Sequence, residues 1–93
     1  MADPVVHTFD SSGEAYDASQ CSDDISDGDV LAVPAEGVVG FLFEAWPVAV
    51  TSAVGEFHAA RDLAGMISDP HRRRSYDKAA ALARSHALEV VAP

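Results

Sequence analysis

The first sixty residues of this 93-residue sequence contain no lysine or arginine, and this absence sets the main expectation about function. The same sixty residues contain eleven carboxylates, whereas residues 61–93 contain six basic and four acidic side chains. The two parts therefore carry charges of −11 and +2, which sum to the net charge of −9. A charge distribution of this kind repels nucleic acid over most of the surface and attracts basic partners.

Cysteine and long apolar runs are also scarce. Cys21 is the only cysteine, which excludes an internal disulfide and fits a reducing compartment. The first ten residues, MADPVVHTFD, have neither the basic region nor the apolar core of a secretory signal. The longest apolar stretch, residues 38–50, is too short to span a bilayer and is interrupted by Glu44 and Pro47. We therefore expect a cytoplasmic protein without a membrane span.

Motifs for catalysis or cofactor binding are lacking as well. The four histidines are scattered, and no pair has the spacing, with a central glutamate, of a zinc protease. There is no phosphate-binding glycine loop and no nucleophile elbow. Asp23 and Asp24 follow Cys21 closely, and their charge disfavours the thiolate that a nucleophile needs. We therefore expect a protein that is not an enzyme and that has no cofactor and no metal.

The residues that are present predict one α+β domain spanning 1–93. Apolar residues make up 48% of the chain, enough for the core of one small domain. A β-branched and aromatic segment at 5–9 predicts a strand, and the spacing of Ser11 and Glu14 predicts a capping box that starts a helix over 12–20. Further strands are expected at 30–34, 38–43, 46–51 and, more briefly, within 55–60. The loop before residue 38 ends with Gly37, which suits a left-handed turn position.

The last third of the sequence predicts helices. Residues 60–67 predict two turns weakened by Gly65, and Asp69 followed by Pro70 predicts the start of a longer helix that ends near residue 88. A stripe of mostly small residues, which lets this helix pack closely, comprises Tyr76, Ala79, Ala80, Ala83 and Ala87. The expected fold is thus a small antiparallel sheet of three to five strands with a short N-terminal helix and a longer C-terminal helix.

The run CSDDISDGD at 21–29 admits three interpretations. An EF-hand calcium loop aligned on Gly28 fails, because its third position would be Ile25 and its twelfth Pro34, neither of which supplies a carboxylate. A weaker metal site and a solvated turn before a strand stay open. The third interpretation is an acidic face for a protein partner. The contacts that we predict for it are Asp17, Asp23, Asp24, Asp27 and Asp29.

A second charged feature, Arg72 to Arg74, lies at the start of the last predicted helix, where cations oppose the helix dipole. These arginines either pair with the acids of 10–29 or bind phosphate, which helix N-termini favour. With residues 60–67 they also form a weak helix-turn-helix pattern. A homo-oligomer, in which the basic helix of one copy meets the acidic face of another, is a further alternative.

Three segments, HTFDSSGEAYDASQ, DGDVLAVPAEGVVGFL and EAWPVAVT, carry a resemblance that spans about residues 7–51. They resemble a group of small, mostly uncharacterised proteins encoded by actinobacteria and their phages and plasmids. The resemblance implies no established activity, only an accessory or mobile-element setting in which small acidic proteins often bind and block other proteins.

Our leading hypothesis is a non-enzymatic acidic interaction module that binds and blocks a basic protein, one that itself binds nucleic acid, by imitating the charge of DNA. The alternative is a nucleic-acid or phosphate-binding module that uses Arg72, Arg73 and Arg74. A third hypothesis, a small enzyme, requires a cleft that gathers several of the acids.

Overall fold

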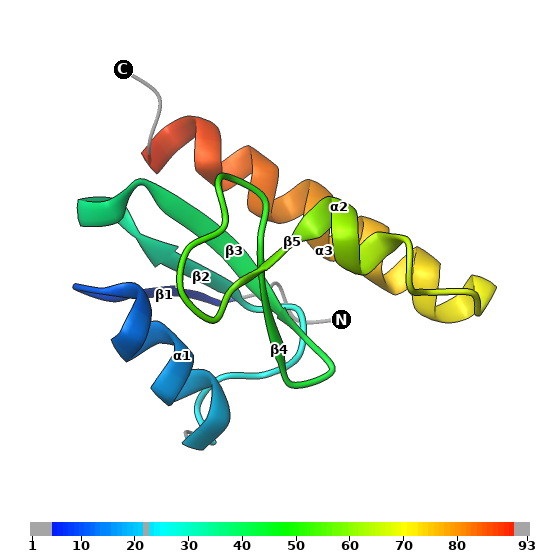
Figure 1. Cartoon of the computed structure of the whole chain (residues 1–93), viewed down its shortest axis with the longest axis horizontal. Helices are drawn as coiled ribbons and strands as arrows, with labels where there is room; N and C mark the ends of the chain where they lie inside the picture. Colours follow the sequence, from blue (N-terminus) through cyan, green and yellow to red (C-terminus); the bar gives the residue numbers. More distant parts are fainter. Residues whose placement is uncertain (1–4, 22, 91–93) are drawn as a thin grey trace.

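A five-stranded sheet lies between two helical layers in the computed structural model, which describes residues 5–21 and 23–90 (Figure 1). The strand order in the sheet is the order of the strands in the chain. The strands are β1 (Val6–Thr8), β2 (Val30–Val33), β3 (Val38–Phe43), β4 (Trp46–Ala49) and β5 (His58–Ala59). The helices are α1 (Ser12–Cys21), the short 3-10 helix η1 (Pro34–Glu36), α2 (Ala60–Ala64) and α3 (Pro70–Val90).

The predicted α+β class is confirmed, but the sheet is mixed rather than wholly antiparallel. Strands β2, β3 and β4 form the expected antiparallel meander. Both outer strands, however, pair in parallel with their neighbours, β1 with β2 and β5 with β4. Helix α1 connects β1 to β2 and returns the chain to the same end of the sheet, which is how parallel neighbours are usually joined. The loop at 50–57 does the same for β4 and β5.

The central strands are buried on both faces, since every residue of β2 and β3 is buried. Alternate side chains of β3 enter two separate cores, as the pleat of a strand requires. The core under α3 includes Phe41, Phe43, Val48, Ile67, Tyr76, Ala80 and Ala83. The core on the side of α1 includes Ala15, Leu31, Val33, Leu42, Ala49 and Phe57. None of the described helices combines the length and the apolar character that a bilayer span requires.

The predicted helix starts are confirmed by their hydrogen bonds. The Glu14 amide donates to Ser11 Oγ at 3.2 Å, as in a capping box. The Glu14 carboxylate accepts from the amide of Asp10 at 3.3 Å, one residue earlier than the standard motif. At the start of α3, Asp69 Oδ1 accepts from the His71 amide at 2.9 Å. Gly37 has a φ of 68° and closes the β2–β3 connection in the left-handed region, as expected.

Tyr76 is the first and largest side chain of the predicted stripe on α3. It is 2% exposed and packs edge-on against Phe41 and Phe43, with ring centroids 5.4 and 5.2 Å away. Its hydroxyl donates a hydrogen bond to the Ala60 carbonyl oxygen, which links α3 to the start of α2. Burial raises the pKa of Tyr76 above its usual value of 10.0, against the lowering effect of Arg84 and Arg73.

Candidate functional site

The turn between β3 and β4 has an unusual backbone. Glu44 and Ala45 form a two-residue hairpin loop in which both residues have positive φ, 49° and 70°. Loops of this kind favour asparagine or glycine, so glutamate and alanine are strained here. Two other segments hold the turn, because the Asp27 carboxylate accepts from the Glu44 amide and Gln20 Nε2 donates to the Ala45 carbonyl oxygen at 2.8 Å. The end of α1 and the 23–29 loop therefore meet at this turn.

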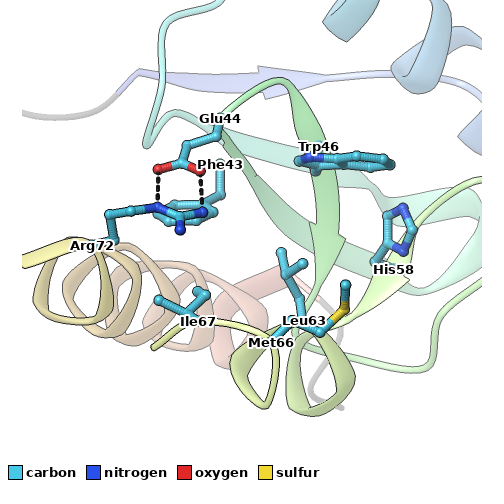
Figure 2. A pocket seen from close by; sticks show the side chains of 8 residues that line it. All are labelled: Phe43, Glu44, Trp46, His58, Leu63, Met66, Ile67 and Arg72. Atoms are coloured by element: carbon cyan, nitrogen blue, oxygen red, sulfur yellow. Dashed lines mark hydrogen bonds and ion pairs between the residues drawn. The ribbon is translucent and has the colours of Figure 1, made fainter. Parts of the chain in front are cut away.

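The Glu44 side chain connects the same turn to α3. Arg72 binds its carboxylate with two hydrogen bonds, from Nε at 2.8 Å and from a terminal nitrogen at 2.5 Å (Figure 2). The hydrogen bond from Arg72 is the main cause that lowers the pKa of Glu44. A two-point contact of this type fixes the geometry of both side chains. It therefore holds the N-terminal turn of α3 against the β3–β4 hairpin.

The arginine partners differ from those suggested by the sequence. The acids of 10–29 do not pair with Arg72, Arg73 or Arg74 in the described residues. Arg73 instead binds Asp77 at 3.0 Å and the Ala64 carbonyl oxygen at 3.1 Å, and Arg74 contacts His71 Nδ1 at 3.0 Å. The unfavourable interaction of these cations with the helix dipole is thus offset within the molecule. The offsetting groups are Glu44 and residues of α3 rather than the predicted acids of 10–29.

Trp46 lies beside this turn and is the most exposed aromatic side chain of the described core strands, at 52%. Its ring packs edge-to-face against His58 of β5, with centroids 4.8 Å apart. Both rings border two pockets. The first, the apolar pocket, has a volume of about 160 Å³ and is shown in Figure 2. Its remaining lining residues are Phe43, Glu44, Leu63, Met66, Ile67 and Arg72.

The second pocket, the polar pocket, has a volume of about 320 Å³. Besides Trp46 and His58, its lining residues are Tyr16, Gln20, Ala45, Pro47 and Glu56. The sequence did not reveal either pocket, because their walls come from segments far apart in the chain. These are α1, the β3–β4 hairpin, the 50–57 loop, β5, α2 with the segment after it, and the start of α3. Trp46 is the first residue of the strand predicted at 46–51, and a tryptophan before a proline at a strand end is also a candidate for exposure.

The predicted acidic contacts divide into two groups. Asp17, Asp23, Asp24 and Asp27 are exposed. Asp17 lies about one helical turn before the end of α1, and the other three belong to the following loop. Asp17, Asp23 and Asp27 make no ion pair with any described residue. These side chains therefore present carboxylates to solvent close to the β3–β4 turn.

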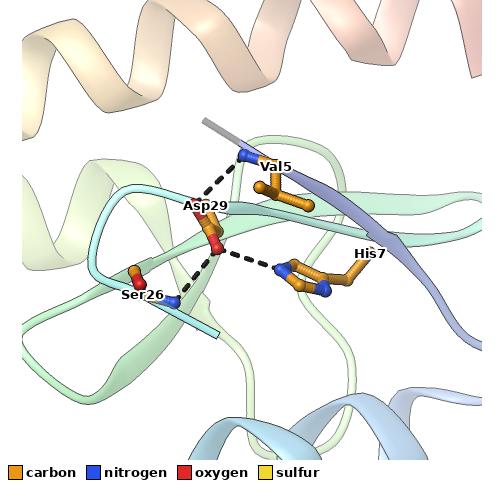
Figure 3. A network of polar contacts seen from close by, with 4 residues as sticks. All are labelled: Val5, His7, Ser26 and Asp29. Atoms are coloured by element: carbon orange, nitrogen blue, oxygen red, sulfur yellow. Dashed lines mark hydrogen bonds and ion pairs between the residues drawn. The ribbon is translucent and has the colours of Figure 1, made fainter. Parts of the chain in front are cut away.

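Asp29, by contrast, is buried and is not available for the partner contact that the sequence predicted. It is 6% exposed and its two oxygens are occupied (Figure 3). Oδ2 accepts from His7 Nε2 at 2.9 Å and from the Ser26 amide at 3.0 Å, and Oδ1 accepts from the Val5 amide at 3.1 Å. Its carboxylate thus holds β1 against the start of β2 and stabilises the end of the 23–29 loop.

The buried position of Asp29 predicts a dependence of stability on pH. Burial raises its pKa, but the hydrogen bonds from His7, Ser26 and Val5 outweigh burial and bring the pKa below 3.8. Because the folded pKa is depressed, the stabilisation is complete above 3.8 and is lost as the pH falls through the folded value. Asp29→Ala should lower the free energy of unfolding by about 2 to 3 kcal/mol at neutral pH.

Urea denaturation at neutral pH and at several acid pH values measures this effect. The stability of Asp29→Ala should depend less on pH below 3.8 than that of the wild type. Asp23→Ala, which removes an exposed carboxylate from the same loop, is the control and should change little. An equal acid dependence in Asp29→Ala and the wild type would contradict the assigned role.

Comparisons with family models, with curated proteins and with solved structures gave no match. The resemblance of residues 7–51 to small actinobacterial and phage proteins therefore stays a prediction. Among the described residues, no group of three or more histidine, cysteine, aspartate or glutamate side chains is arranged to hold a metal ion. The apolar and polar pockets contain one carboxylate each, Glu44 and Glu56.

Proposed function

We propose that the protein is a non-enzymatic acidic interaction module that binds a basic protein partner through Asp17, Asp23, Asp24 and Asp27. The observation that carries the proposal is the exposure of these carboxylates, of which Asp17, Asp23 and Asp27 form no ion pair with the arginines of α3 or with any other described residue. Exposed charge of one sign steers an oppositely charged partner and selects against others. A partner that binds nucleic acid would be blocked, because its basic surface would be occupied.

Trp46 supports a binding function beside α1, because Tyr16 and Gln20 of that helix line the polar pocket together with Trp46. Tryptophan is enriched among the residues that contribute most to protein interfaces, and here it lies half-exposed between two pockets. Met66, 77% exposed, borders the apolar pocket and offers an adaptable apolar surface. A partner bound to the exposed carboxylates would thus also contact apolar surface nearby.

The alternative of nucleic-acid binding has less support. Arg72 is bound at two points by Glu44, and Arg73 by Asp77 and a backbone carbonyl. A phosphate would have to compete with these contacts, and the carboxylate of Glu44 would repel it. Arg74 contacts only a histidine among the described residues, and one arginine gives weak phosphate binding.

Neutralising part of the acidic surface tests the proposal. The double variant Asp17→Asn with Asp23→Asn should bind a basic partner captured from source cells roughly three- to tenfold more weakly, because each exposed ion pair contributes little alone. The wild-type affinity should fall as salt rises. Calorimetry with the purified partner measures both effects.

The matched control is Asp62→Asn with Glu89→Gln, which removes the same charge from the C-terminal third and should bind like the wild type. Equal binding by both double variants would contradict the proposal. A mobility-shift assay at low salt tests the alternative. Retardation of DNA or RNA by the wild type, but not by a variant with alanine at 72, 73 and 74, would favour nucleic-acid binding instead.

A further inference from the structure

The polar pocket has the chemistry of a site for a cation. Its lining includes the aromatic rings of Tyr16 and Trp46, the imidazole of His58 and one carboxylate, that of Glu56. The face of an aromatic ring attracts a cation, and tryptophan does so most strongly. Glu56 is exposed and makes no ion pair with any described residue. The negative charge in this pocket is therefore not neutralised by the described part of the chain.

The apolar and polar pockets, which share Trp46 and His58, differ in this respect. In the apolar pocket the carboxylate of Glu44 is already bound by Arg72. In the polar pocket, no arginine of the described residues pairs with the Glu56 carboxylate. The polar pocket also includes Ala45, whose carbonyl oxygen accepts only the Gln20 amide among the described residues and retains a second lone pair. A ligand with several N–H groups can donate to both the Glu56 carboxylate and the Ala45 carbonyl oxygen.

We propose that the polar pocket receives an arginine side chain of the basic partner, with its guanidinium against Trp46 and Tyr16 and its N–H groups directed to Glu56. This inference rests on the proposed function and names the residue type that the partner inserts. Arginine suits the pocket better than lysine, because its flat guanidinium stacks on aromatic rings and donates in two directions. The pocket volume of about 320 Å³ is sufficient for such a side chain.

The chain offers a direct reporter, since Trp46 is its only tryptophan. We expect hexa-arginine to change the Trp46 fluorescence in a saturable manner at low salt. Hexa-citrulline, which has nearly the same shape without the charge, should not do so. Glu56→Gln should weaken hexa-arginine binding roughly three- to fivefold, and Trp46→Leu, measured by calorimetry, by a similar factor. Both variants change exposed side chains, and circular dichroism confirms their folding.

Glu89→Gln is the matched control, because it removes one glutamate charge near the opposite end of α3 from Arg72. It should bind hexa-arginine with wild-type affinity. Equal binding by Glu56→Gln, Trp46→Leu and the wild type would overturn the pocket assignment. A hexa-citrulline affinity equal to that of hexa-arginine would also overturn it, as would an absence of hexa-arginine binding.

Failure of the pocket assignment can be separated from failure of the proposed function. If the captured partner binds Glu56→Gln normally but binds the Asp17 and Asp23 double variant weakly, the acidic surface is correct and the pocket is wrong. If neither change affects the partner, both proposals are wrong. Weaker binding by both variants, with Glu89→Gln unchanged, supports both.

Discussion

Replacing Gly40 with alanine should lower the free energy of unfolding by about 3 kcal/mol, near the upper end of the usual cost of overpacking. Gly40 lies in the middle of β3, opposite Ala49 of β4. A Cβ atom at Gly40 would lie 2.0 Å from the Val48 carbonyl oxygen and 2.8 Å from its carbonyl carbon. These are backbone atoms of a paired strand, so they cannot move aside without disturbing the sheet. Valine or isoleucine at this position should prevent folding.

Gly65→Ala is the matched control for this substitution. Gly65 has a right-handed backbone, and a Cβ there would meet the Asp62 carbonyl oxygen at an ordinary 3.6 Å. Its stability should equal or slightly exceed that of the wild type, since alanine restricts the unfolded chain more than glycine. Urea denaturation followed by circular dichroism compares the two variants. Similar stabilities would show that β4 can shift away from β3, which would contradict the predicted close approach.

Replacing Tyr76 with alanine should lower the free energy of unfolding by about 4 kcal/mol, because it removes a buried ring from the centre of the core under α3. Tyr76→Phe keeps the ring contacts with Phe41 and Phe43 but leaves the Ala60 carbonyl oxygen without its partner. That change should cost about 1 kcal/mol. Leu88→Ala is the control on the same helix, because Leu88 is 74% exposed and its loss should change stability little.

Tyr76 also predicts a loss of stability in alkali. Its folded pKa is raised above 10.0, so its contribution is complete below 10.0 and disappears as the pH rises through the folded value. Denaturation measured over this alkaline range should show a smaller decline for Tyr76→Phe than for the wild type. Equal declines would show that other groups cause the alkaline unfolding.

Local sequence signals were sufficient for most elements of the fold. The capping residues Ser11 and Asp69 and the left-handed Gly37 act through neighbouring atoms, so the sequence alone locates them. The parallel pairing of β1 and β5 depends on how the connections at 9–29 and 50–57 cross the sheet. The close approach at Gly40 depends on the partner strand. Neither property is encoded within the segment concerned.

The candidate site was predictable only in part. The acidic composition of the 23–29 loop is visible in the sequence, and four of the five predicted contacts are exposed. Asp29 has the same side chain as Asp27, yet it is buried because the amides of Val5 and Ser26 and the ring of His7 surround it. Trp46 and Glu56 become one pocket only when the β3–β4 hairpin, α1 and β5 come together.

The agreement between strand order and chain order has a consequence for how the molecule folds. Each strand pairs with the strand before or after it in the chain, so no strand has to insert between two that have already paired. The β2–β3–β4 meander involves short loop closures and is the expected nucleus, since contacts between close segments form fastest. Segments 5–9 and 58–59 then dock late, and hydrogen exchange should find these two edges the first to open.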